Sequence, residues 1–390
     1  MKIIEVVLGK ANPDRMNGIN QVAHYLSTAL AELGHEVTLW GIASNTRHDY
    51  PPRPYATVLF RQLPQKWKID PRLHEAIDQL GADHVVHLHG AFIPEFYHIA
   101  RRLQARGIPY VYTPHGALTT TAMRKNGLAK RLYFRLFEAR IIRRARMVQL
   151  LGINEYRCID TWFHVPNKCL VPNGIDLSEL PAGLRPDFSA GDELVFGFCG
   201  RMDNYYKGLD VLFEGFRKFL DSGRRGRIEL IGDGPDRGWL EDYARELGIA
   251  DKLVFHGARF GEEKFSLLAR TQVFVLPSRS EGFPIGVLEA AGMGLPCLTT
   301  EPTNVNSFIR QYEAGFPVRE PGDADALAEA MCQAHDAFAS GRLALIGANA
   351  RRMAEEAFNW QHIARQMVQV YRGKAPAPHD RALKPMIHAG

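Results

Sequence analysis

The feature that most constrains the fold is an alternation of short apolar runs with amphipathic stretches of helical period. In the first half, four runs have the length of buried strands: residues 3–8, 36–40, 85–88 and 110–113. Residues 19–33 and 95–106 are predicted helices, and Gly34 fits the position of a C-cap glycine. Such alternation favours an α/β fold with a doubly wound parallel sheet, which binds ligands beyond the carboxyl ends of its strands.

The chain has 390 residues, whereas a single core rarely serves more than roughly 250–300, so two domains are expected. Residues 171–176 (Val-Pro-Asn-Gly-Ile-Asp) precede a stretch without periodicity, and the alternation restarts at Leu194. We therefore predict two Rossmann-like α/β domains facing across a cleft. The predicted parts are an N-terminal domain (1–175), a linker (176–192), a C-terminal domain (193–357), a C-terminal helix (358–372) that could cross back to the first domain, and a flexible tail (373–390).

Composition excludes several classes of protein. With 46% hydrophobic and 23% charged residues the chain is that of a globular protein, and no apolar run reaches the roughly 20 residues of a membrane span. The N-terminal run turns polar too early for a secretory signal. Five scattered cysteines without a CxxC pair argue against a disulfide framework or a zinc site, so a cytoplasmic setting is expected. A net charge of +5 does not by itself indicate nucleic acid.

A loop with two cations follows the first predicted strand of the second domain. Residues 200–208 (Gly-Arg-Met-Asp-Asn-Tyr-Tyr-Lys-Gly) place Arg201 and Lys207 on a loop that leads directly into a helix. A helix N-terminus adds N–H donors and a partial positive charge, so this loop is suited to bind an anion. Two solvated loop cations are the alternative interpretation.

Two glutamates follow about eighty residues later. Glu281 lies in the loop after a predicted strand, and Glu289 lies in the next helix among Val, Leu, Ala and Gly. A carboxylate in such surroundings needs a partner, and the ribose hydroxyls of a nucleotide would be suitable donors. The alternatives are a surface position or an internal salt bridge for Glu289, and a helix-capping role for Glu281.

Together these motifs resemble a known family. The Gly-Arg…Lys-Gly loop, followed by Ser-x-x-Glu-Gly-Phe and a second glutamate eight positions later, is similar to the retaining glycosyltransferases of the GT-B fold, more narrowly to family four. Residues 171–176 and the Gly-Asp-Gly-Pro sequence at 232–235 are also typical of that family. The resemblance covers nearly the whole chain. It implies transfer of a hexose-type sugar from a UDP- or GDP-sugar to a saccharide acceptor in polysaccharide or glycan assembly.

The resemblance implies roles for the charged residues. Arg201 and Lys207 would bind the diphosphate of the nucleotide-sugar and offset the charge that develops as the glycosidic bond breaks. Glu289 would hold the ribose. Glu281 would contact the donor sugar near its reacting carbon.

Further donor contacts are implied in both domains. Backbone groups of Phe283, Pro284 and Ile285 would meet sugar hydroxyls, although Pro284 has no N–H to donate. In the first domain, His115 in the sequence Thr-Pro-His-Gly-Ala resembles the family's histidine that touches the donor sugar and shapes the acceptor site. A purely structural histidine is the alternative. The family's two-glycine loop near the first strand is represented by Gly18 alone.

No metal or other cofactor is expected. The single Asp-x-Asp pair, Asp323 and Asp325, follows Pro-Gly at a predicted helix start, where acids serve as caps. Arg201, Lys207 and helix N-termini could replace a cation at the diphosphate. Retention by double displacement would need a carboxylate nucleophile, for which the sequence makes no clear case. The resemblance implies a same-face substitution in which the leaving phosphate helps to deprotonate the acceptor.

The segment Arg124–Arg146 is strongly basic, with nine Lys or Arg residues and Glu138 as its one acid. Its apolar residues recur at helical spacing and are Leu128, Leu132, Leu136, Phe137 and Ile141. A basic amphipathic helix can lie on an anionic membrane or guide a lipid-diphosphate-linked acceptor, which would make the protein peripheral on the cytoplasmic membrane face. An ordinary helix with its apolar stripe in the core is the alternative.

Other functions remain open to test. A nucleotide-sugar epimerase or hydrolase on the same fold would release nucleotide without an acceptor, and a non-catalytic binding subunit would show no turnover. A dinucleotide oxidoreductase fits less well, because Gly232 and Gly234 are followed next by Gly238 and do not complete Gly-x-Gly-x-x-Gly. No motif supports a nucleic-acid partner.

Overall fold

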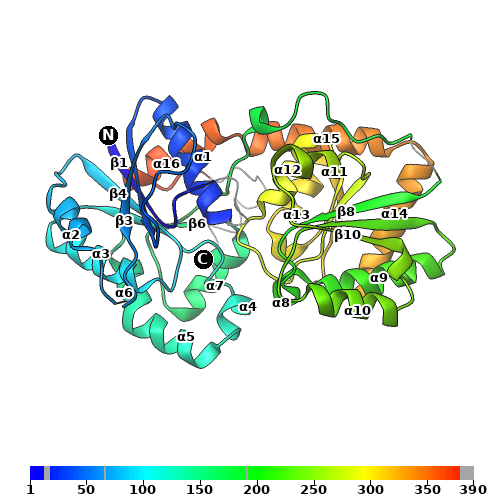
Figure 1. Cartoon of the computed structure of the whole chain (residues 1–390), viewed down its shortest axis with the longest axis horizontal. Helices are drawn as coiled ribbons and strands as arrows, with labels where there is room; N and C mark the ends of the chain where they lie inside the picture. The colour runs from blue at the N-terminus through cyan, green and yellow to red at the C-terminus, as the bar shows by residue number, and fades with distance from the viewer. Residues whose placement is uncertain (13–17, 66, 190–191, 378–390) are drawn as a thin grey trace. The chain divides into compact units, whose positions relative to one another are not determined.

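The computed structural model describes residues 1–12, 18–65, 67–189 and 192–377, which form two compact units (Figure 1). The first unit comprises residues 1–174 together with the chain from 360 onward, and the second comprises residues 175–359. Each unit is built on one parallel sheet with helices packed against it. The prediction of two doubly wound α/β domains is confirmed.

The first sheet has seven parallel strands in the order β3-β2-β1-β4-β5-β6-β7. They are β1 (Lys2–Leu8), β2 (Glu36–Ala43), β3 (Ala56–Arg61), β4 (His84–His89), β5 (Tyr110–Thr113), β6 (Met147–Leu150) and β7 (Lys168–Leu170). The order reverses between β1 and β4, where Glu5 lies opposite His87 in the register. Loops at the carboxyl ends of strands beside such a reversal form the usual ligand site of doubly wound sheets.

Helices of the first unit connect these strands. They are α1 (Gly18–Glu32), α2 (Pro71–Asp78), α3 (Pro94–Ala105), α4 (Thr120–Arg124), α5 (Gly127–Tyr133), a π-helical turn (Phe134–Glu138), α6 (Ala139–Arg144) and α7 (Ile153–Trp162). Gly34 follows α1 with a φ of 83°, as expected of a C-cap glycine. The late helix α16 (Trp360–Tyr371) packs on α1, β5 and β6, so the chain returns to its first unit (Figure 1).

The second sheet has six parallel strands in the order β10-β9-β8-β11-β12-β13. They are β8 (Leu194–Cys199), β9 (Gly226–Ile231), β10 (Leu253–Gly257), β11 (Val273–Leu276), β12 (Cys297–Thr300) and β13 (Gly315–Val318). Its helices are α8 (Asn204–Lys207), α9 (Leu209–Asp221), α10 (Arg237–Glu246), α11 (Gly261–Leu268), α12 (Ile285–Met293), α13 (Asn306–Tyr312), α14 (Ala324–Ala339) and α15 (Leu343–Ala357). The order reverses between β8 and β11.

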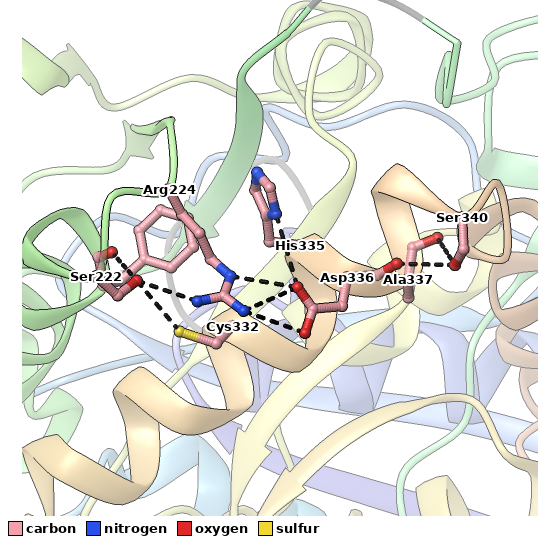
Figure 2. Close-up of polar contacts among 8 residues, drawn as sticks. Ser222, Arg224, Cys332, His335, Asp336, Ala337 and Ser340 are labelled. Carbon is pink, nitrogen blue, oxygen red and sulfur yellow. Dashed lines mark hydrogen bonds and ion pairs between the residues drawn. The ribbon is translucent and has the colours of Figure 1, made fainter.

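Helices α9 and α14 pack together through an apolar face with a polar rim. Phe216 and Phe219 of α9 are fully buried. At the rim, Arg224 donates to both carboxylate oxygens of Asp336 at 2.9 and 3.2 Å and to the Ser222 hydroxyl at 3.2 Å (Figure 2). Because this ion pair is largely solvated, the apolar contact supplies most of the stabilisation between the two helices.

The segment predicted as a linker is grouped with the second unit in its described part. Leu177 and Leu180 cover Gly292 so closely that a Cβ there would lie 2.7 and 2.8 Å from their methyl groups. A Cβ on Gly347 would lie 3.0 Å from the Phe188 ring. Glycines in α12 and α15 therefore give this aperiodic stretch a surface on which to pack.

Two expectations from the composition concern membrane-spanning helices and disulfides. None of the described helices is both long and apolar enough to cross a membrane. All five cysteines fall within the described ranges, and the structure pairs none of them in a disulfide.

Candidate functional site

Two loops meet at the strand reversal of the second sheet. Residues 200–208 follow β8, and residues 277–284 follow the neighbouring β11. The Arg279 backbone N–H donates to the Tyr206 carbonyl at 2.7 Å, and its guanidinium donates to the Asn204 carbonyl at 3.0 Å. The two loops that the sequence singled out thus form one connected platform.

Lys207 and Glu281 form an ion pair on this platform. The Lys207 Nζ donates to Glu281 Oε1 over 2.5 Å, and the Ser278 hydroxyl donates to the same oxygen over 2.7 Å. The lysine and glutamate side chains are only 18% and 14% exposed, so the pair is poorly screened by water. Glu281 does not cap α12, whose N-cap residue is Pro284. An anion that enters here meets a cation already held in place.

Arg201 lies on the same loop and is exposed. Its guanidinium makes no hydrogen bond or ion pair with the part of the chain that the structure describes. Its loop is fixed by backbone bonds from Gly200 N–H to the Ile231 carbonyl and from Met202 N–H to the Asp233 carbonyl, at 3.0 and 2.9 Å. The loop is therefore ordered, while the guanidinium remains available to a ligand.

Gly232 permits the close approach of these loops. Its φ is 144°, and a Cβ at this position would lie 1.9 Å from the Gly200 carbonyl oxygen. No residue with a side chain could occupy this conformation without moving the Arg201 loop.

Glu289 has an internal partner. Its Oε1 accepts a hydrogen bond of 2.7 Å from Nζ of Lys264 in α11, and both side chains are mostly buried. The internal salt bridge considered as an alternative is thus present. Lys264 was missed from the sequence because no motif marks it. Glu289 Oε2 makes no hydrogen bond within the described ranges and remains free to accept one.

Of the residues after Glu281, Phe283 lies in the core, whereas Pro284 and Ile285 lie at the start of α12. The Phe283 ring is buried, with its centroid 5.3 Å from that of Phe358. Pro284 precedes α12 and Ile285 begins it, so the first free N–H donors of this helix start at Ile285. Asn304 donates to the Glu281 and Gly282 carbonyls at 3.1 and 2.9 Å, which fixes the loop.

His115 of the first unit has an unusual backbone. It follows β5 with a φ of 54° and is half-buried. The buried Glu155 carboxylate accepts hydrogen bonds from the Gly116 and Leu118 N–H groups, at 3.0 and 3.1 Å. Burial raises the pKa of Glu155 to about 7. The left-handed turn is thus secured by a carboxylate that the sequence did not single out.

A buried cluster lies behind His115. The Nε2 of His115 is 3.0 Å from Nδ1 of His89, whose Nε2 is 2.5 Å from Oε2 of Glu5. The same Glu5 oxygen lies 3.1 Å from Nδ1 of His87, and Tyr371 donates to the other oxygen over 2.7 Å. The alternation His-Leu-His on an apolar strand is the sequence signal that could have revealed this cluster.

Glu5 is held in its ionised form by its neighbours in the cluster. Burial alone would raise the pKa of Glu5, but the electrostatic interactions and hydrogen bonds with His87 and His89 outweigh it and hold that pKa well below its usual range. Glu5, His87 and His89 have the chemistry of metal ligands, yet their polar atoms face one another, Tyr371 and the Thr113 hydroxyl. We assign no metal to them.

Gly18 is the exposed first residue of α1, and residues 13–17 before it lie outside the described ranges. Nearby, Asn20 accepts from the Ala11 N–H at 2.7 Å and donates to the Leu8 carbonyl at 3.3 Å. This buried asparagine fixes how the chain leaves β1.

The Asp-x-Asp pair caps a helix. Asp323 accepts from the Asp325 and Ala326 N–H groups at 2.9 and 3.0 Å, and Asp325 pairs with Lys218. The predicted cap is confirmed for Asp323.

The basic segment begins at the end of α4 and, after a short break, continues as an unbroken helical run over residues 127–144, formed by α5, the π-helical turn and α6. Ile141 is buried, but Leu128, Leu132 and Leu136 are 86%, 61% and 42% exposed. The three leucines recur every four residues, so they share one face. The alternative of an apolar stripe in the core holds for Ile141 and is wrong for these leucines.

Two family models match the chain. One is described as Glycosyltransferase Family 4 and matches residues 16–179, and the other as Glycosyl transferases group 1 and matches residues 193–337. The two matches fall on the first and the second unit. They cover most of the described sequence, including the Arg201 and Glu281 loops.

Relatives of similar sequence are also glycosyltransferases by their names. An O-antigen chain mannosyltransferase C of Escherichia coli is 34% identical over 47% of both chains, and a UDP-Gal:α-D-GlcNAc-diphosphoundecaprenol α-1,3-galactosyltransferase of Escherichia coli is 26% identical over 65% of this chain and 66% of its own. The matched region thus spans about half to two thirds of these relatives. Sucrose-phosphate synthase of Thermosynechococcus elongatus has the same fold, with a TM-score of 0.74 at 22% identity, over 95% of this chain and 98% of its own. The chain belongs to the group 1 and family 4 glycosyltransferases of the GT-B fold.

Proposed function

We propose that the protein is a retaining, metal-independent glycosyltransferase that moves a sugar from a UDP- or GDP-sugar to a saccharide acceptor in glycan assembly. The observation that carries the proposal is the poorly solvated pair of Lys207 and Glu281 at the strand reversal of the second sheet, beside the available guanidinium of Arg201. A nucleotide diphosphate is the ligand that such a set of charges fits.

The proposed chemistry is electrostatic. As the glycosidic bond breaks, negative charge grows on the diphosphate, and preorganised cations lower the barrier. Arg201 can bind phosphate oxygens bidentately, whereas Lys207 supplies a point charge. Because Asp323 and Asp325 are engaged by a helix start and by Lys218, they support no metal site, and the two cations take that role.

Glu289 is proposed to hold the ribose. Its Oε1 stays with Lys264, while Oε2 accepts from a ribose hydroxyl. The salt bridge would then fix the orientation of the carboxylate rather than compete with the nucleotide. The acceptor is proposed to bind the first unit, near His115.

Calorimetric titration with UDP and with GDP tests the donor site. One nucleotide should bind the wild type, and Glu289→Ala should weaken that binding by about tenfold, the loss of one hydrogen bond to a charged group. Glu263→Ala in the neighbouring α11, whose carboxylate pairs with Arg259 at the surface, is the matched control and should bind like the wild type. Failure of both nucleotides to bind would overturn the proposal.

Turnover assays separate the transferase from its alternatives. Transfer should depend on an added acceptor, persist in EDTA, and give a product with the anomeric configuration of the donor by NMR. Release of UDP without an acceptor would favour a hydrolase or epimerase. Bound nucleotide with no turnover under any acceptor would favour a binding subunit.

The acceptor is proposed to be lipid-linked, at an anionic membrane surface. Leu128, Leu132 and Leu136 form an exposed apolar face on α5 and the following turn, amid the lysines and arginines of the segment Arg124–Arg146. Exposed leucines between basic side chains are the pattern of helices that lie in a membrane interface. The E. coli galactosyltransferase named above acts, by its name, on a diphosphoundecaprenol-linked sugar.

The first unit also has a basic hollow. It lies between α3 and α6 and is lined by Arg101, Arg140 and Arg144, among others. Arginines that line a hollow suit the phosphate groups of lipids, because a guanidinium can donate two parallel hydrogen bonds to one phosphate. The hollow supplies positive charge and the leucine face supplies apolar area, and an anionic membrane surface would interact with both.

Vesicle co-sedimentation tests the membrane proposal. Phosphatidylcholine vesicles with 30% phosphatidylglycerol (about a third anionic lipid, to give the surface charge that attracts basic segments) should bind the protein, and pure phosphatidylcholine should not. Leu128→Glu should abolish binding. The control Leu345→Glu changes a leucine of the second unit that is also exposed, at 66%, and should bind like the wild type. Equal binding by both variants would refute the leucine face as the contact.

A further inference from the structure

We propose that Glu5 and His89 are positioning residues that fix the tautomer and orientation of His115, so that its Nδ1 is presented as a hydrogen-bond acceptor to a substrate hydroxyl. The inference rests on the proposed function, because it assigns the geometry of a residue that this function uses. It concerns a chain of three side chains from β1, β4 and the turn after β5.

Hydrogen-bond direction follows from the first member of the chain. Glu5 is fully buried and ionised, so its carboxylate can only accept. The His89 Nε2, 2.5 Å from this carboxylate, must therefore carry the proton. When the His89 ring holds this one proton, its other nitrogen is bare, so Nδ1 of His89 accepts.

The direction of the next hydrogen bond, between His89 and His115, follows in the same way. The His115 Nε2 lies 3.0 Å from the bare Nδ1 of His89 and must donate. Burial, together with the neighbouring His89 and His87, holds the pKa of His115 well below its usual range, so the ring is neutral. Its Nδ1 is consequently bare, and it makes no hydrogen bond with the residues that the structure describes. A carboxylate that fixes a histidine through its other nitrogen is a general means of setting its tautomer.

A second buried carboxylate acts on the same residue. Glu155 holds the N–H groups of Gly116 and Leu118, which secures the left-handed backbone of His115. Such a backbone is unfavourable for a residue with a side chain, by about 1 kcal/mol. Two carboxylates from different elements thus place a single half-buried imidazole, Glu5 through the His89 ring and Glu155 through backbone N–H groups.

Protonation of His89 would reverse the direction of the chain. Both nitrogens of His89 would then donate, Nε2 of His115 would accept, and its Nδ1 would carry the proton. The two directions present opposite hydrogen-bonding groups to a substrate, so they are distinguishable by experiment.

Nitrogen NMR on the full-length protein, labelled with ¹⁵N-histidine, tests the inference. The His115 signals are assigned by their loss in His115→Gln. At neutral pH the wild type should show Nε2 protonated and Nδ1 bare, the bare nitrogen resonating far downfield. The opposite pattern would overturn the inference.

Variants separate positioning from packing. Glu5→Gln can offer either an acceptor or a donor to His89, so the two His115 nitrogen shifts should converge as both tautomers become populated. Tyr371→Phe removes a different bond to Glu5 and should leave the His115 pattern unchanged. An unchanged pattern in folded Glu5→Gln would refute the role, and if that variant does not fold, the wild-type tautomer still decides. None of these readouts depends on turnover, so failure of the transferase proposal would be seen separately.

Discussion

Lys207 is the residue on which the proposed chemistry depends most. Lys207→Ala removes the cation that would stabilise the leaving diphosphate, and kcat should fall by about 10²- to 10³-fold, the loss typical of one preorganised charge or donor. Lys218→Ala, which breaks an exposed pair with Asp325, is the control and should keep both kcat and KM. Steady-state kinetics checks both variants, and a wild-type kcat for Lys207→Ala would remove this residue from the mechanism.

Glu138 predicts a pH dependence of stability. Burial raises its pKa to about 7, although Tyr112 donates a hydrogen bond to it, and its Oε2 has no partner among the described residues. Between pH 4.5 and 7 the folded chain holds a proton here that the unfolded chain releases, so the free energy of unfolding falls as pH rises. The loss amounts to about 3 kcal/mol.

Glu138→Gln tests this dependence, since the amide has a similar shape and does not titrate. Urea unfolding at pH 5 and pH 7.5 should show a smaller decline for the variant than for the wild type. Glu155 has a raised pKa too and remains in both proteins, so it contributes equally to both slopes. Parallel declines would show that Glu138 is ionised without penalty in the folded state.

At the scale of elements, the sequence predicted strands and helices whose apolar pattern is long and regular. β5 has its predicted bounds, residues 110–113, and the predicted run 85–88 lies within β4. β7, with three residues, and β13, which contains Gly315 and Pro317, carry too little apolar pattern to be recognised. Glu5, His87 and Glu155 escaped notice because contacts between distant segments, rather than local spacing, bring their side chains together.

The loop platform predicts opposite effects for two glycines. Gly232→Ala would place a Cβ 1.9 Å from the Gly200 carbonyl, so it should destabilise the second unit by about 3 kcal/mol or more and abolish nucleotide binding. Gly238→Ala lies in α10, where a Cβ meets nothing within 4 Å, and should stabilise by about 0.5–1 kcal/mol. Thermal unfolding of both variants measures this, and similar shifts would mean that the close approach is not required.

For the whole molecule, the order of the chain differs from the order of its units. α16 comes last in the described chain but packs in the first unit, where it buries Ile363, Met367 and Val370 against α1, β5 and β6. Tyr371 reaches from this helix to Glu5 in the first strand. Folding of the first unit therefore requires residues that follow the complete second unit.

Removal of residues 360–390 should consequently affect the two units unequally. Deleting α16 exposes several large apolar side chains, each worth about 1.5–3 kcal/mol when buried, a sum comparable to the total stability of a domain. Hydrogen exchange followed by mass spectrometry should show lost protection in peptides from residues 1–174 and retained protection in peptides from 175–359. Met367→Ala should give a weaker version of the same pattern, and exposed Arg365→Ala should give none. Equal loss of protection in both units would mean that α16 stabilises the molecule as a single cooperative body.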